Sequence, residues 1–547
     1  MSSTLYRHGV VHSPADPFAE ALVVEDGVIA WIGADDTADG MADRADEVVD
    51  LNGALVAPGF VDAHAHLLET GFALDGIALT REAGVRSLAD ALAAVHEAAR
   101  SRAGSEPLLG HGWDEQGWPE GRAPRIEELD QAAGGRPVYL ARVDAHSAVV
   151  SSSFAEAAGL RGLPGWSEDG RVERDAHHAA RALARDVGDE RREELALRAM
   201  RAAAAVGIVS LHEQSAPFID TREGLAQLIA ATSDAASGLP LVVGYRGELC
   251  VTSDDARELM AAIPGLTGIG GDLSVDGSLG SRTAALRAPY TDAPAGSEHP
   301  NGALYLSAEQ ICNHLGSVTR AGLQAGFHVI GDRAMDELLI GMRAAVDVEG
   351  VDAIRGAGHR IEHAEMIDAH ALATLVLLGV RLSVQPAFDA AWGGPDGMYA
   401  ARLGAGRAAA LNPLADLAAA GIPLAFGSDA PVTPFDPWGA VRAAISHQAA
   451  DQRISARAAF RAHTRGGWRA AGLDHTGAGE IRVGAPAHLA IWRAEHLAVQ
   501  GAGGRVATWS TDARAGTPLL PDLEPGAVAP QCVRTVRSGV VLHDELA

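Results

Sequence analysis

Residues 58–66 read Pro-Gly-Phe-Val-Asp-Ala-His-Ala-His, and no other stretch constrains the fold and chemistry of this chain as strongly. The apolar run at 54–61 is typical of a buried strand. Side chains two apart on a strand point the same way, so His64 and His66 project together from its carboxyl end. Two neutral imidazoles aimed at one point can share a cation. A bare pair of this kind is more often found in a surface loop, but the preceding strand and the His and Asp residues described below favour a metal site.

The composition is that of an ordinary globular protein, with 47 % apolar and 21 % charged residues among 547. The formal net charge of −27 argues against nucleic acid or an anionic membrane surface as a partner. No apolar run approaches a membrane span, and residues 1–7 show no basic region followed by an apolar stretch, so we expect no secretory signal. Cys250, Cys312 and Cys532 are far apart and fit no metal motif, so we expect reduced thiols in a cytoplasmic protein.

Residues 58–477 alternate Ala-rich helical patterns with short apolar strands. Helices are predicted at 87–100, 190–206, 221–235, 308–325 and 334–346, and strands at 207–211, 240–244, 273–275, 326–330, 381–385 and 423–426. This alternation predicts an α/β fold, in which helices cover a parallel sheet. Polar residues follow the strands, as in a (β/α)8 TIM-like barrel, whereas the glycine-rich fingerprint of an open dinucleotide-binding sheet is missing. Residues from about 80 to 200 fit a barrel less well and are predicted to be an insertion over its mouth.

Both ends of the chain are rich in short strands. A hairpin is predicted at 21–33, with an Asp26-Gly27 turn, and further strands at 47–51 and 54–56. Strands are also predicted at 487–492, 533–537 and 540–542. We therefore expect residues 1–57 and 478–547 to form one discontinuous small β-sandwich domain beside the barrel.

Further candidates for metal chemistry lie at or just after predicted strands, namely His328, His363 and Asp429. Imidazoles and carboxylates together suit zinc, iron, manganese or nickel. A cation held by them can make water more acidic and polarise a carbonyl, which indicates hydrolysis. Asp429 ends the last convincing barrel strand and is the expected general acid/base. The histidines beyond the first pair either complete one metal shell, hold a second metal or polarise the carbonyl.

The motifs at 276–286, 328–334, 360–365 and 427–431 resemble the YtcJ-like branch of amidohydrolase family 3, which includes the N-substituted formamide deformylases. The resemblance covers nearly the full length and extends to 111–114 and 144–147. It implies a divalent metal, zinc first, held by His64, His66, His328, His363 and Asp429, with Asp429 and His363 as catalytic groups.

The chain departs from the family pattern at two places. Asp272 stands where the branch usually has Lys, and Val149 and Ser151 replace the Trp and Asn that usually follow His146. Asp has one methylene where Lys has four, so we expect Asp272 to stop short of a bridging position and to orient a ligand imidazole instead. A bridging role stays open. One firmly bound metal is therefore favoured, with a second left open.

The predicted function is hydrolysis of a C–N bond in a small amide or cyclic amide. Candidate pocket residues are Trp113, Trp118, His146, His212 and Arg282. Deamination or isomerisation on the same site, and a metal-binding protein without turnover, are the alternatives. A small molecule is the expected partner, and a homodimer is left open.

Overall fold

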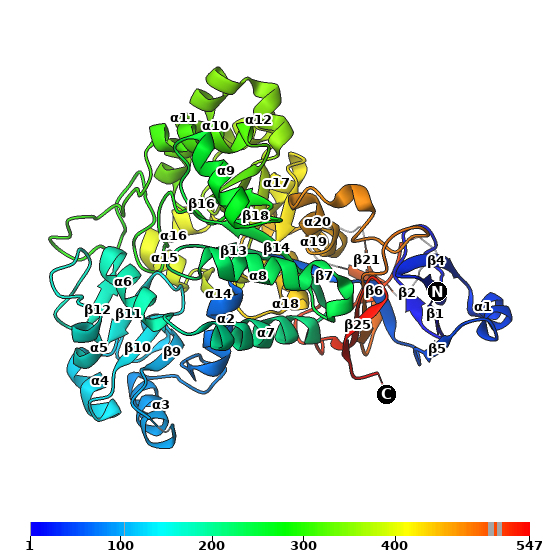
Figure 1. The fold of residues 1–547 in the computed structure, drawn as a ribbon, viewed down its shortest axis with the longest axis horizontal. Helices are drawn as coiled ribbons and strands as arrows, with labels where there is room; N and C mark the ends of the chain where they lie inside the picture. Colours follow the sequence, from blue (N-terminus) through cyan, green and yellow to red (C-terminus); the bar gives the residue numbers. More distant parts are fainter. Residues whose placement is uncertain (1, 103, 502–507, 511–516, 547) are drawn as a thin grey trace.

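Eight parallel strands form the centre of the molecule (Figure 1). The structure is a computed structural model that describes residues 2–102, 104–501, 508–510 and 517–546. In order around the sheet, the strands are β7 (Phe60–Ala65), β13 (Ile208–Ser215), β14 (Leu241–Arg246), β15 (Gly268–Ile269), β16 (Gln324–Val329), β17 (Arg360–His363), β18 (Arg381–Val384) and β19 (Leu424–Phe426). The sheet closes because the Asp429 amide donates to the His64 carbonyl at 2.8 Å and the His66 amide donates to the Ala430 carbonyl at 2.9 Å. The predicted barrel is confirmed.

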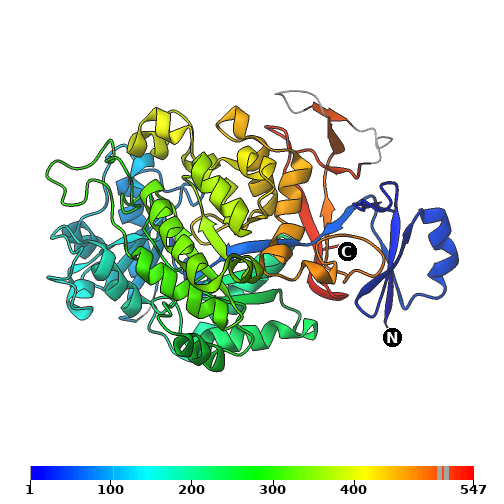
Figure 2. The ribbon, with the colours of Figure 1, turned by 90° about the horizontal axis from the view of Figure 1, so that it is seen from above.

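Helices follow the barrel strands and cover their outer side (Figures 1 and 2). They include α7 (Asp189–Ala205), α8 (Arg222–Ser233), α9 (Ser253–Ala262), α10 (Ala308–Arg320), α11 (Asp332–Glu349), α13 (Ala369–Leu378), α17 (Leu414–Ala419) and α20 (Arg465–Ala470). In α10 the buried residues Ile311, Leu315 and Val318 recur at helical spacing, so one face packs on β16. Ser307 caps this helix by accepting from the Gln310 amide. The helix ends at Arg320, earlier than predicted, because β16 already begins at Gln324.

The predicted strand at 273–275 is wrong. The barrel strand in this part of the chain is β15, and among the described residues the strand pairing of 273–275 is limited to an isolated bridge between Ser274 and His328. Gly270 and Gly271 have φ values of 107° and 58°, which glycine adopts readily and other residues do not. The chain therefore leaves the ladder at these glycines and turns before residue 272.

The two ends of the chain meet in one sheet beside the barrel, as the fold prediction requires. Its order is β2 (Val10–Val11), β6 (Leu55–Pro58), β20 (Leu489–Arg493), β24 (Gln531–Arg537) and β25 (Val540–Asp544). A second sheet holds β4 (Val28–Gly33), β3 (Ala21–Glu25), β1 (Ser3–Arg7) and β5 (Glu47–Asp50), and α1 (Asp35–Ala42) packs on it. Buried residues from both ends, such as Leu22 and Val533, share one apolar core. The exact limits at 57 and 478 stay a prediction.

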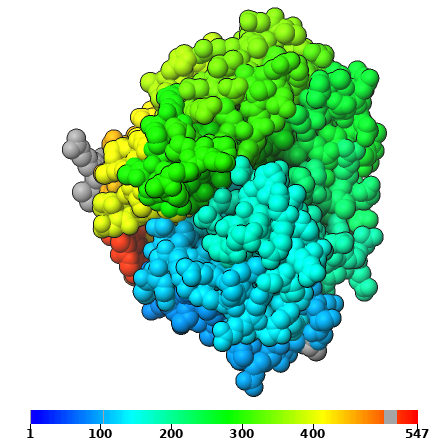
Figure 3. Space-filling model, turned by 90° about the vertical axis from the view of Figure 1, so that its left-hand side faces the viewer, coloured from blue at the N-terminus to red at the C-terminus, as the bar shows by residue number. Residues whose placement is uncertain are grey.

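A separate sheet lies at the opposite end of the long axis from these terminal sheets (Figures 1 and 2). Its order is β12 (Arg171–Glu173), β11 (Ser147–Val150), β10 (Val138–Arg142), β9 (Leu108–Trp113) and β8 (Ile77–Ala78). The helices α3 (Leu88–Ser101), α4 (Ile126–Ala133), α5 (Ser152–Ala157) and α6 (Arg174–Ala184) pack on it. Figure 3 shows this insertion, coloured blue to cyan, packed against green segments of the barrel. In the described parts of the chain, no helix is long and apolar enough to cross a membrane.

His314 links α10 to two neighbouring segments in its neutral form. Its Nδ1 accepts from the Cys250 amide at 3.0 Å, and its Nε2 donates to the Ile269 carbonyl at 3.1 Å. Burial lowers the pKa of His314 to about 4. Protonation of Nδ1 would remove the acceptor that Cys250 uses.

We expect His314→Asn to lose part of the acid sensitivity of the wild type. The unfolded chain binds a proton at His314 near its ordinary pKa of 6.5, whereas the folded chain resists protonation until the pH reaches about 4. His314 therefore lowers wild-type stability as the pH falls through this window, by at most about 3 kcal/mol. In urea unfolding, the difference in the free energy of unfolding between wild type and variant should become smaller from neutral pH to about pH 5. A constant difference would contradict this assignment.

Candidate metal centre

The residues predicted as metal ligands gather, together with Asp272, at the carboxyl ends of the barrel strands. His64 lies in β7, His66 directly after it, His328 in β16, His363 at the end of β17, Asp429 after β19 and Asp272 after β15. The four histidines and Asp429 are buried, each with 7 % exposure or less. The carboxyl end of a barrel is where this fold assembles its active sites.

Both carboxylates lie against the inner nitrogens of the imidazoles. Asp429 Oδ1 is 3.3 Å from His64 Nε2 and 3.2 Å from His66 Nε2. Asp272 Oδ1 is 3.2 Å from His328 Nδ1, 3.3 Å from His363 Nε2 and 3.8 Å from His64 Nε2. Its Oδ2 is 3.7 Å from His66 Nε2. Asp272 is thus central to the cluster.

The sequence predicts that Asp272 contacts a ligand imidazole but stops short of a bridging position. Its carboxylate oxygens lie 3.2–3.8 Å from nitrogens of all four histidines, so the predicted contact is present, and whether Asp272 bridges stays a prediction. Gly270 and Gly326 allow neighbouring segments to approach closely: a Cβ on Gly270 would lie 2.1 Å from the Gly326 carbonyl oxygen. A Cβ on Gly271 would lie 2.2 Å from Gln214 Oε1. This close approach compensates for the short Asp side chain.

Each of the four histidines donates from its outer nitrogen to a protein oxygen. The pairs are His64 Nδ1 with Glu362 Oε2 (2.8 Å), His66 Nδ1 with the Gln214 carbonyl (2.9 Å), His363 Nδ1 with Gln385 Oε1 (2.8 Å) and His328 Nε2 with the Gly277 carbonyl (3.2 Å). These contacts orient the rings and fix the neutral tautomers, as partners of metal-bound histidines do. Each neutral imidazole then carries its lone pair on the inner nitrogen. Four lone pairs and two carboxylates converge, and only a positive charge among them would make this favourable.

The two carboxylates also favour positive charge beside the imidazoles. Burial by itself would lower the pKa of His64, but Asp429 and Asp272 raise it well above the ordinary value. Burial would raise the pKa of Asp429, yet His64 and His66 hold it below its usual range. His64 Nε2 has no hydrogen-bond partner among the described residues. The donor set therefore fits a divalent cation such as zinc, iron, manganese or nickel.

Backbone strain is concentrated at two of these positions. His363, Ala364 and Asp429 have φ values of 69°, 50° and 56°, in the left-handed region that non-glycine residues rarely occupy. Such conformations cost about 1–3 kcal/mol each and persist where the surroundings enforce them. They turn His363 and Asp429 away from regular strand geometry at the ends of β17 and β19.

The buried ion pair between Arg360 and Glu362, which the sequence analysis did not assign, orients His64. Arg360 is fully buried and forms a two-pronged contact with Glu362, one arm of which, Nη2 to Oε2, measures 2.8 Å. Its Nη2 also donates to the Ala63 carbonyl at 2.7 Å. Arg360 keeps Glu362 ionised, and Glu362 orients His64. The sequence held a signal for this pair, because Arg360 and Glu362 are two residues apart on β17 and therefore point to the same face of the strand.

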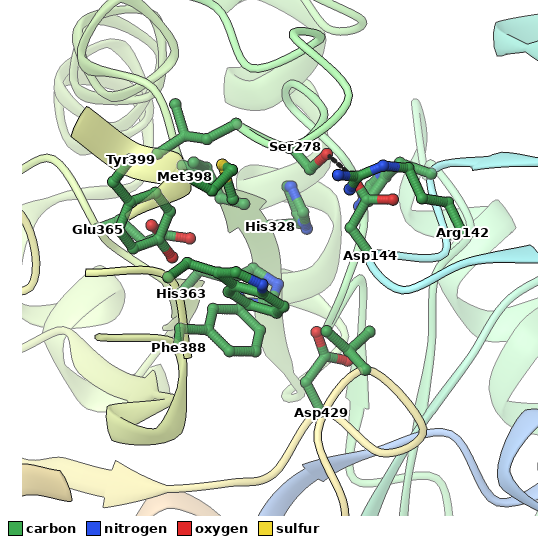
Figure 4. Close-up of a pocket in the computed structure, with 16 residues that line it drawn as sticks. Arg142, Asp144, Ser278, His328, His363, Glu365, Phe388, Met398, Tyr399 and Asp429 are labelled. Atoms are coloured by element: carbon green, nitrogen blue, oxygen red, sulfur yellow. Dashed lines mark hydrogen bonds and ion pairs between the residues drawn. The ribbon is translucent and has the colours of Figure 1, made fainter. Parts of the chain in front are cut away.

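A cavity adjoins the cluster (Figure 4). The residues His328, His363 and Asp429 line it together with polar groups of the insertion, Arg142, Asp144 and His146. An apolar and aromatic wall completes it, formed by Leu279, Ile330, Phe388, Trp392, Met398, Tyr399 and Val432. Phe388 stacks on the His363 ring at 6.0 Å. Sequence reasoning named the metal-site residues here but missed the aromatic wall, which comes from segments 386–403.

Of the five candidate pocket residues, only His146 lines this cavity, where its ring lies 5.3 Å from that of His328. Trp113 and Trp118 pack in the core of the insertion, and the Trp113 indole donates to the Leu140 carbonyl. Their polar-aromatic loop thus stabilises the insertion itself.

The other two candidates also lie elsewhere. His212 sits inside the barrel, where its Nδ1 accepts from Arg360 at 3.0 Å and its ring lies 5.9 Å from that of Tyr245. Arg282 pairs with Asp292 at 2.7 Å and lines neighbouring surface hollows. Neither contacts the cavity beside the histidines.

Comparisons with known proteins agree with this centre. The amidohydrolase family profile matches residues 47–543. YtcJ of Bacillus subtilis, named as an amidohydrolase, is 27 % identical over 457 residues, which cover 79 % of this chain and 81 % of the relative. The N-substituted formamide deformylase of Arthrobacter pascens is 29 % identical over 157 residues, 29 % of each chain.

A solved structure extends the likeness to three dimensions. An uncharacterized metal-dependent hydrolase from Pyrococcus horikoshii matches with a TM-score of 0.70 and 25 % sequence identity, over 90 % of this chain and 97 % of that one. Sequence profile, barrel and buried His/Asp cluster are consistent with one another. The chain belongs to the amidohydrolase family, in the group that includes YtcJ and the N-substituted formamide deformylase.

Proposed function

We propose that this protein is a metal-dependent hydrolase of a C–N bond in a small amide or cyclic amide. The convergence of four oriented imidazoles and two carboxylates carries the proposal, because that donor set fits a divalent cation and adjoins a cavity. A relative whose name describes the deformylation of an N-substituted formamide supports an amide substrate. Zinc is the metal we favour for such donors.

We propose two overlapping donor sets that share Asp272. His64, His66 and Asp272 form one set, and Asp272, His328 and His363 form the other. Asp429 contacts His64 and His66 and also groups with His64 and His363. A divalent cation in this centre would supply a Lewis acid that polarises the scissile carbonyl and makes water more acidic. Asp272 would then be in direct contact with metal, and the geometry favours two cations over the single one expected from its short side chain.

Asp429 is the proposed general acid/base. It is held ionised by the neighbouring histidines, so it can accept a proton from the attacking water. The same carboxyl group, now protonated, would deliver that proton to the leaving nitrogen. Asp429 lines the cavity, as a group that meets both water and substrate must. His363 lines it too, and its stacking on Phe388 would hold it beside the substrate carbonyl.

We expect Asp272→Ala to lose at least one of two bound metals and to lower the affinity for the other. The reason is that its carboxylate contacts imidazoles of both donor sets. Metal content after gel filtration and a competition titration with a chelator measure both effects. The matched control is Asp347→Ala, which removes an exposed carboxylate on α11. If the metal affinity falls by only about ten- to a hundredfold and the number of bound metals is unchanged, Asp272 instead orients a ligand imidazole without contacting the metal.

The proposed function is tested by metal analysis together with a panel of amides, formamides and lactams. We expect stoichiometric divalent metal and the release of amine and carboxylate from some members. Release of ammonia without carboxylate would instead indicate deamination. Full metal content without turnover of any amide, ester or lactam would overturn the assignment as a hydrolase and favour a metal-binding protein.

A further inference from the structure

The cavity has a charged wall formed by the insertion, opposite Glu365 and Tyr399 (Figure 4). Arg142 and Asp144 form this wall with Ser278, and Arg142 Nη1 lies 3.1 Å from Asp144 Oδ2. Figure 4 shows His328, His363 and Asp429 between the two walls. A substrate whose scissile bond lies at the metal cluster would therefore reach this charged wall with another part.

The two oxygens of Asp144 differ in their contacts. Oδ2 accepts from the hydroxyls of Ser278 and Ser281, each at 2.7 Å, in addition to its ion pair with Arg142. Oδ1 has no hydrogen-bond partner among the described residues, although Asp144 is only 8 % exposed. A buried carboxylate oxygen without a donor costs free energy that a donor on a ligand would recover. The contacts of Oδ2 hold the carboxylate rigidly for such a ligand.

The surrounding charges favour a cation as that ligand. Arg142 contacts three carboxylates: Asp114 at 2.9 Å, Glu115 at 2.9 Å and Asp144. Of these, Glu115 is the only one with a second arginine partner, Arg402, at 3.2 Å. Negative charge therefore exceeds positive charge around Arg142, although Arg142 Nη1 also has no hydrogen-bond partner among the described residues.

We propose that Asp144 binds a protonated amine of the substrate, so that the enzyme prefers amides that carry an ammonium group. The inference rests on the proposed function in one respect, because it places the scissile bond at the metal cluster across the cavity. Oδ1 of Asp144 accepts from the ammonium group on one side of the metal cluster, and the aromatic rings of Phe388 and Tyr399 lie on the other side (Figure 4). The insertion thus selects the substrate, while the barrel strands hold the metal ligands.

Binding of three small acetamides to the metal-loaded full-length protein, measured by calorimetry, tests the proposal. N-Acetylethylenediamine carries the ammonium group, N-propylacetamide replaces it by a methyl group, and N-acetyl-β-alanine carries a carboxylate. We expect the ammonium probe to bind wild type at least about tenfold more tightly than the methyl probe, which is the scale of one charge-assisted hydrogen bond. The carboxylate probe should bind most weakly.

The variant Asp144→Asn should bind the ammonium and methyl probes with affinities that differ less than about twofold. The matched control is Asp114→Asn, which removes one carboxylate from Arg142 without touching the cavity and should keep the preference. Thermal unfolding of both variants checks that the fold is retained. Equal wild-type binding of the ammonium and methyl probes, no detectable binding of the ammonium probe, or an unchanged preference in Asp144→Asn would overturn the proposal. Preference for the carboxylate probe would make Arg142 the recognition group instead.

These outcomes are independent of the test of the proposed function. Ligand preference is read from binding alone, whereas hydrolysis is read from metal content and product release. An ammonium preference in a protein that hydrolyses no amide would leave Asp144 assigned and the reaction unassigned. Amide hydrolysis without an ammonium preference would do the reverse.

Discussion

Replacement of both His64 and His66 by alanine is expected to remove tightly bound metal and all measurable turnover. Both imidazoles point from the end of β7 toward Asp429. Their Nε2 atoms lie 3.3 Å (His64) and 3.2 Å (His66) from Asp429 Oδ1. No other side chain in the described structure is placed to replace two inner nitrogens at this position. The loss of two ligands from one set should lower metal affinity by far more than the ten- to a hundredfold that is typical of supporting residues. Metal analysis of the purified variant measures the effect.

The control for this variant is the double replacement His96→Ala and His475→Ala. Both histidines are exposed, on α3 and near residue 474, and neither approaches the cluster. This control should keep wild-type metal content and turnover. Full metal content in the His64/His66 variant would show that the cation lies elsewhere.

Asp429→Asn is expected to keep the fold and more metal than the histidine variants, while kcat falls by at least about a hundredfold. Asn preserves the size of the side chain and one oxygen toward His64 and His66, but it cannot accept a proton from water. The left-handed backbone at residue 429, with φ of 56°, is also tolerated by Asn better than by most residues. Steady-state kinetics on the best amide of the panel and metal analysis together separate the two effects.

Asp451→Asn serves as the matched control, since Asp451 is an exposed carboxylate in a short turn away from the cavity. Turnover close to wild type in Asp429→Asn would show that another group handles the proton. Glu365 would then be the next candidate, because it lines the same cavity and burial raises its pKa to about 7.

The barrel and the clustering of buried His and Asp residues were predictable from sequence because both depend on local periodicity. The alternation of side chains in β7 determines that His64 and His66 share a direction, whatever surrounds them. The helices α3, α7 and α8 follow the predicted segments closely, since their apolar residues recur at helical spacing. His328, His363 and Asp429 each follow the same rule, in which a polar residue ends or follows an apolar strand.

The features that local patterns do not predict depend on contacts distant in sequence. The place of Asp272 depends on the glycine contacts between residues 270 and 326, which no local pattern reports. Trp113 and Trp118 are of a residue type that is common in pocket walls, but they pack in the core of the insertion. His212 lies on β13 with its side chain in the barrel interior, and only the three-dimensional position of Arg360 reveals its partner.

The candidate metal ligands and the polar cavity residues come from different parts of the fold, which affects how relatives of this protein can diverge. Every candidate ligand comes from a barrel strand or the residues that follow it, whereas Arg142, Asp144 and His146 come from the sheet of residues 77–173. The insertion begins after α2 (Leu67–Asp75) and ends before α7. These two helices pack on each other. An exchange of this unit between relatives would start and end at neighbouring points of the fold. New substrate preferences can therefore arise by recombination, without a single change among the candidate metal ligands.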